Sequence, residues 1–74
     1  MVLKMEVEKA VKMFRDGEVI LVVLWKDGYL SVCKLNKVGG ACYTTSRPSK
    51  ANKQLYYMAQ AFYSNLGFKI EKLA

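Results

Sequence analysis

The chain contains no histidine, and its only two cysteines, Cys33 and Cys42, lie nine residues apart. A structural zinc site needs about four Cys or His ligands, which one chain of this composition cannot supply. The absence of histidine also removes the commonest general base and every catalytic triad that depends on it. No G-x-x-x-x-G-K-[ST] loop occurs, and Gly39-Gly40 is too short to cradle a phosphate. The sequence therefore predicts a protein that is not an enzyme, uses no cofactor or metal and has no small-molecule substrate.

Long apolar runs and proline are also scarce. The longest uninterrupted apolar run, Val19 to Trp25, is far shorter than the ~20 residues of a transmembrane helix. Charges at Lys4, Glu6 and Glu8 interrupt any signal-peptide segment. With one proline and 53% apolar residues, the 74-residue chain has the composition of a packed globule. We expect one small domain over residues 1–74, cytoplasmic and without membrane contact.

Acidic residues are missing from more than half of the chain, because none occurs between Gly28 and Ile70. Residues 1–27 carry five basic and five acidic groups, whereas residues 28–74 carry seven basic groups and one acid. The second part therefore holds the whole formal charge of +6. This asymmetry favours an electropositive surface for a polyanion. The alternatives are a solubilising charge, or a surface for an acidic protein or a membrane.

The N-terminal segment has the apolar spacing of an amphipathic helix that ends at Gly17. Its apolar residues fall on one helical side: Leu3, Val7, Ala10, Val11 and Phe14. The next two segments, Glu18 to Lys26 and Tyr29 to Lys37, predict a pair of antiparallel strands.

Asp27-Gly28 between these strands fits a two-residue type I′ hairpin turn. Such a turn places Trp25 opposite Leu30 and Val23 opposite Val32, on the face that we assign to the helices. The other face keeps a large apolar area, which indicates a homodimer. The expected interface residues are Ile20, Val22, Leu24, Tyr29 and Leu35.

After a turn at Gly39-Gly40, Ala41 to Thr45 predicts a third strand, and a second helix is expected from about Lys50 to Leu66. Its predicted core stripe is Ala51, Leu55, Ala59, Phe62 and Leu66. The tail from Phe68 to Leu73 could add a short edge strand; if it pairs parallel to the third strand, the crossover through the second helix should be right-handed. The expected fold class is α+β: a helix, a three-stranded antiparallel sheet with a hairpin at Asp27-Gly28, a second helix and this edge strand.

The second helix begins among basic residues. A helix N-terminus offers free N–H groups and a positive dipole end, which suit phosphate. Basic side chains oppose that dipole unless an anion is present, so we expect contacts to a nucleic-acid backbone with little sequence specificity. The candidate residues are Arg47, Ser49, Lys50 and Lys53, with Lys34 and Lys37 as a second basic pair. The alternative function is a non-enzymatic protein–protein interaction module, such as a homodimeric assembly factor or inhibitor.

The expected αβββα order, with the basic helix start Ser49-Lys50-Ala51-Asn52-Lys53, resembles the double-stranded-RNA-binding domain. The resemblance is one of topology and implies that the helix start holds phosphates across a groove.

The two cysteines fall in adjacent predicted strands. They could form a cross-strand disulfide if the register places them opposite each other. In a mesophilic cytosol they would instead be two reduced, small apolar residues. The sequence leaves both states open.

Overall fold

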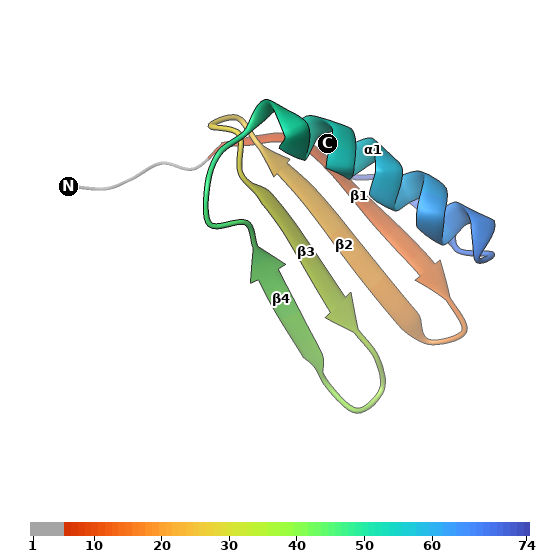
Figure 1. Cartoon of the computed structure of the whole chain (residues 1–74). Helices are drawn as coiled ribbons and strands as arrows, with labels where there is room; N and C mark the ends of the chain where they lie inside the picture. Colours follow the sequence, from red (N-terminus) through yellow and green to blue (C-terminus); the bar gives the residue numbers. More distant parts are fainter. Residues whose placement is uncertain (1–5) are drawn as a thin grey trace.

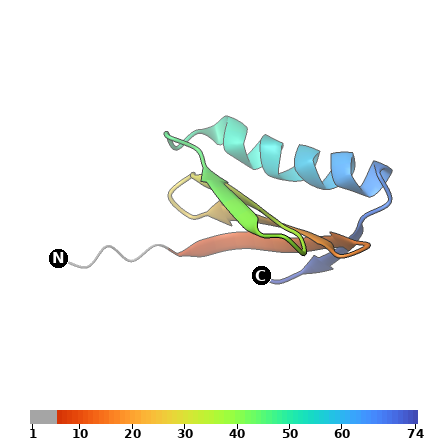
Figure 2. The same ribbon diagram turned by 90° about the horizontal axis from the view of Figure 1, so that it is seen from below.

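The computed structural model describes residues 6–74 as five strands and one helix. The strands are β1 (Val7–Arg15), β2 (Glu18–Trp25), β3 (Leu30–Leu35), β4 (Gly40–Thr44) and β5 (Lys69–Lys72), and the helix α1 spans Lys50–Asn65. All strands pair antiparallel in one sheet, in the order β4-β3-β2-β1-β5 (Figure 1). Helix α1 forms a layer on one face of this sheet, and no described element covers the other face (Figure 2).

The expected N-terminal helix is wrong, because its described part forms β1; Leu3 lies outside the described residues. The part of the chain that the structure describes is therefore α+β with a single helix, and the likeness to the double-stranded-RNA-binding domain does not hold. Asp16 and Gly17 have φ values of 46° and 81°, as the two central residues of a type I′ turn require. They join β1 to β2 in a tight hairpin instead of ending a helix. As a strand, β1 buries Val11 and Met13 in the core.

The β2–β3 loop differs from the expected two-residue turn. The Trp25 N–H donates to the Tyr29 carbonyl and the Gly28 N–H donates to the Trp25 carbonyl, each at 2.9 Å. The loop therefore holds three residues, and Gly28 has a φ of +96°, the arrangement of a turn followed by a left-handed residue. The extra residue moves the register by one, so that the partner of Leu30 is Leu24 and not Trp25.

This register decides which face of β2 the helix covers, because successive side chains of a strand point to opposite faces. Ile20, Val22 and Leu24 face α1 and are buried in the core. The side assigned to the helices, with Val23 and Trp25, is instead the open face of the sheet. Three of the residues expected at a dimer interface thus lie inside a single chain.

Helix α1 begins at Lys50 as expected, and the Ser49 hydroxyl caps it by accepting from the Ala51 N–H at 3.1 Å. Its rotation about its own axis differs from the expectation. The residues that face the sheet are Asn52, Tyr56, Ala59 and Tyr63. Most of the predicted core stripe is consequently exposed, including Leu55, Phe62 and Leu66.

The C-terminal tail forms the edge strand β5, which pairs antiparallel with β1, from Val11 opposite Lys72 to Phe14 opposite Lys69. The parallel pairing with the third strand, which the sequence left open, does not occur. The Arg15 guanidinium donates to the Leu66 carbonyl at the end of α1, which holds the start of the tail beside β1. The sheet therefore gains its fifth strand on the side away from β4.

We expect Gly28→Ala to destabilise the protein by about 1–3 kcal/mol, the cost of a non-glycine residue at a positive φ. A Cβ at this position would also lie 3.2 Å from the Pro48 Cβ. Urea unfolding monitored by circular dichroism measures the change. Gly39→Ala is the matched control, because a Cβ there meets nothing within 4 Å; equal midpoints for the two variants would contradict the role of Gly28.

The β3–β4 register places Cys33 directly opposite Cys42, and a disulfide joins them. We expect reduction to lower the free energy of unfolding by about 2–3 kcal/mol, from the chain entropy that a short closed loop removes from the unfolded state. Urea unfolding with and without a reductant tests this. The Cys33→Ala/Cys42→Ala variant should not respond to the reductant, and an unchanged wild-type midpoint would show that the disulfide contributes nothing.

Candidate functional site

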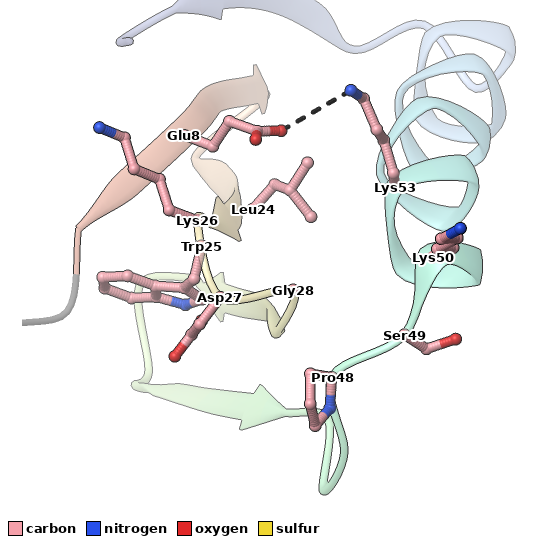
Figure 3. A pocket seen from close by; sticks show the side chains of 10 residues that line it. All are labelled: Glu8, Leu24, Trp25, Lys26, Asp27, Gly28, Pro48, Ser49, Lys50 and Lys53. Atoms are coloured by element: carbon pink, nitrogen blue, oxygen red, sulfur yellow. Dashed lines mark ion pairs between the residues drawn. The ribbon is translucent and has the colours of Figure 1, made fainter.

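A cleft of about 470 Å³ lies between the β2–β3 loop and the start of α1 (Figure 3). Three lysines and two carboxylates line it: Lys26, Lys50, Lys53, Glu8 and Asp27. Figure 3 shows Lys53 pointing toward Glu8, and their Nζ and Oε2 atoms are 3.9 Å apart. Lys26 pairs with Glu6 at 3.0 Å. These pairs are exposed and contribute little to stability, but they neutralise part of the positive charge around the cleft.

The start of α1 is fixed by the buried side chain of Asn52. Its Nδ2 atom lies within hydrogen-bond distance of three acceptors: the Gly28 carbonyl at 2.8 Å, the Arg47 carbonyl at 3.1 Å and the Thr45 hydroxyl at 3.2 Å. The Ser49 N–H adds a bond to the Gly28 carbonyl at 3.3 Å. The β2–β3 loop, the end of β4 and the start of the helix are thereby joined, which sets the position of the basic residues around them.

The structure gathers only part of the expected contact group. Arg47, Ser49, Lys50 and Lys53 lie together at the start of α1, and all are exposed. Lys34 lies near the other end of β3 and Lys37 in the turn that follows it; that end is about 17 Å from the start of the strand at ~3.3 Å per residue. The Lys34 ammonium lies 5.8 Å from the centre of the Tyr63 ring, and Lys37 packs beside Gly17 in the β1–β2 turn.

Three further basic residues on the helix-bearing face of the sheet were missed. Strand alternation places Lys9, Arg15 and Lys72 there, beside α1. The Lys9 ammonium lies 5.4 Å from the Tyr57 ring centre, and the Arg15 guanidinium lies 4.5 Å from that of Phe68. Because a helix was predicted for the segment of Lys9 and Arg15, these side chains were not expected on one face of a sheet. The even spacing of Lys9, Val11, Met13 and Arg15 places all four on one face of a strand, and only a strand interpretation of this segment would have shown it.

Two pKa values near this face are shifted. Hydrogen bonding with the Tyr57 hydroxyl, followed by the electrostatic effect of the same group, raises the pKa of Lys9. Burial raises the pKa of the Tyr56 phenol. Both shifts favour the protonated forms, so at neutral pH the Lys9 side chain is a cation and the Tyr56 phenol is neutral.

The open face of the sheet has a different character. Alternation and register place apolar residues there, among them Phe14, Leu21, Val23 and Trp25, together with the disulfide. The Trp25 indole N–H donates to the Ser31 hydroxyl at 2.8 Å, and that hydroxyl lies 2.8 Å from the Thr44 hydroxyl. The charged side chains of this face lie on β1 and β5: Lys12, Lys69 and Glu71. The centre of the open face is therefore uncharged.

Within residues 6–74, no group of three or more His, Cys, Asp or Glu side chains could hold a metal ion. In the same part of the chain, no helix combines the length and the apolar character needed to cross a membrane. Comparison of the chain with known protein families, curated proteins and solved structures gives no match.

We expect Asn52→Leu to lower the free energy of unfolding by about 1–3 kcal/mol, because it removes the part-buried hydrogen bonds from the Asn52 amide to the Gly28 and Arg47 carbonyl groups. Urea unfolding gives the loss, and amide hydrogen exchange at Ser49 reports whether the helix start has separated from Gly28. Gln54→Leu, at an exposed position of the same helix, is the control. Equal stability of the two variants would mean that the Asn52 amide does not fix the helix start.

Proposed function

We propose that the protein binds nucleic acid through the phosphate backbone, on the helix-bearing side of the sheet and with little sequence specificity. The observation that supports this proposal is the separation of charge between the two sides. The helix-bearing side carries these basic residues: Lys9, Arg15, Lys34, Arg47, Lys50, Lys53 and Lys72. The acids beside them are Glu8, which pairs with Lys53, Asp27, which lines the same cleft as Lys50, and Glu18 opposite Arg15.

The spacing of the basic residues suits a backbone better than a single phosphate group. The two groups of the contact set, at the start of α1 and at the far end of β3, are about 17 Å apart along the strand. A nucleic-acid strand presents a phosphate every ~3.4 Å of helix axis, so one strand passing along the domain can reach both groups. Lysines act as point charges without the fixed geometry that reads base edges, which agrees with low specificity.

The proposed function is binding without catalysis. We place it in the cytoplasm, where nucleic acid is accessible. The Cys33–Cys42 disulfide adds a condition to that location. Because disulfides are rare in the cytosol of mesophiles and common in that of hyperthermophiles, the bond would persist in the cytoplasm of a hyperthermophile and would be reduced in that of a mesophile.

A second candidate function is a protein–protein interaction module, an assembly factor or inhibitor. The open face of the sheet supports it, because an apolar sheet face that no described element covers is typical of an interaction surface. This function and nucleic-acid binding use opposite sides of the sheet.

Replacing Arg47, Lys50 and Lys53 together by Ala should weaken binding to all DNA and RNA sequences about equally. If each side chain contacts one phosphate, the slope of log K against log salt should become less steep by about 2–3 on duplex DNA, at about 0.9 per contact. Fluorescence anisotropy with labelled duplexes over a salt series measures both quantities.

The matched control is Lys12→Ala/Lys69→Ala, which removes two charges from the open face. It should leave the slope nearly unchanged. Both variants should remain folded, because the replaced side chains are exposed or, for Lys12, half-buried, and surface substitutions usually change stability by within about 0.5 kcal/mol. No wild-type affinity for DNA or RNA at low salt, or an equal effect of the two variants, would refute the proposal.

A further inference from the structure

Helix α1 has a second apolar side, which faces solvent. Leu55, Met58, Phe62 and Leu66 recur at spacings of three and four, and they expose 43%, 61%, 59% and 46% of their surfaces. At ~100° per residue these four side chains, the helix stripe, lie roughly a quarter turn from the residues that face the sheet. The sequence signal for a packed helix face is therefore present, but no element within residues 6–74 covers this face.

An apolar groove of about 490 Å³ lies beside the helix stripe, between α1 and the β3–β4 hairpin. Leu30 and Val32 of β3 form part of its lining, together with Met58 and Phe62 of the helix and Tyr43 of β4, which is 67% exposed. The groove exists because α1 packs mainly on β2, β3 and β5 and leaves β4 uncovered. Protruding side chains and a groove that could receive them thus occupy one continuous surface.

We propose that a second copy of this chain docks on this surface, with Met58 and Phe62 of each copy entering the groove of the other. Charge supports a second copy as the occupant. A chain with a net charge of +6 repels its own copies. No charged residue occurs from Gln54 to Phe68, so two copies can approach through this segment with the least repulsion. A polyanion would find no cation in the segment itself. Lys34, one of the proposed phosphate contacts, lies at the border of this surface, 5.8 Å from the centre of the Tyr63 ring that lines the groove.

The available area also fits a twofold dimer. The exposed parts of the helix stripe and of Tyr43 amount to about 600 Å² per copy, taking roughly 200 Å² or more for each whole side chain. A standard stable interface buries about 800 Å² per partner, so the contacts around the groove need to add only a modest remainder. The same patch on both copies, holding both projections and groove, is what an isologous interface requires.

The open face of the sheet is the other candidate for a dimer interface, but its side chains have less exposed apolar surface for a second copy to bury. Its central side chains, such as Leu21 and Val23, are already half-buried by their neighbours on the sheet. Each therefore gains less from a partner than the more exposed side chains of the helix stripe. The dimer interface expected from the sequence is replaced here by a different surface, on the helix.

Sedimentation velocity and equilibrium on the full chain test the proposal. At high micromolar concentration the wild type should have twice its chain mass of 8.4 kDa. Phe62→Lys should raise the dimer dissociation constant by at least about tenfold, the effect of losing one well-packed anchor residue. Ser64→Lys, which adds the same charge at an exposed position on the far side of α1, should leave the dimer nearly intact. Circular dichroism verifies the fold, and Met58→Lys replaces Phe62→Lys if the latter unfolds.

Two results would overturn the proposal. The first is a wild-type mass near 8.4 kDa at the highest attainable concentration. The second is a dimer that survives the stripe variant and dissociates in Leu35→Lys, which places the same charge on the open face at a residue that is 43% exposed. Neither result affects the phosphate contacts, since the salt dependence of nucleic-acid binding is measured separately.

Discussion

The carbonyl oxygen of Gly28 accepts a hydrogen bond from the buried Asn52 amide at 2.8 Å and another from the Ser49 N–H at 3.3 Å. The same residue, with its φ of +96°, closes a β2–β3 loop of three residues. One loop therefore sets both the register of the central strands and the position and rotation of α1. The first decides that Leu24 and its alternating neighbours enter the core. The second decides that the helix stripe remains outside it.

The excess of apolar surface follows from the strand in the middle of the sheet. Both sides of β2 are apolar, so whichever face the helix covers, an apolar face is left over. A domain of this size buries only roughly 60% of the surface of its unfolded chain, and a single helix cannot cover five strands. The surplus appears in two places, on the open face and along the helix stripe. A twofold dimer through the stripe would also place two basic surfaces in one assembly, and the second would bind a polyanion at a high effective concentration.

β4 depends on covalent and backbone interactions more than on packing. All five of its residues are exposed, and α1 does not cover it. Its position relies on the hydrogen bonds to β3 and on the Cys33–Cys42 disulfide. Of the elements that line the groove beside the helix stripe, β4 is therefore the one whose position depends most on whether the Cys33–Cys42 disulfide is formed.

The sequence by itself determined the elements whose signals are local. It was sufficient for the helix that begins after the Ser49 cap, for the two central strands and for the concentration of positive charge after Gly28. It was not sufficient for the segment around Val7 to Phe14. Apolar residues that recur three and four positions apart fit a helix, but they also fit a short strand that is apolar on both faces. Asp16-Gly17 and Asp27-Gly28 are identical dipeptides, yet one makes a two-residue turn and the other part of a three-residue loop. The hydrogen bonds that separate these outcomes join residues distant in sequence, such as Asn52 and Gly28. Register, helix rotation and the choice of buried face were therefore decided only by the tertiary structure.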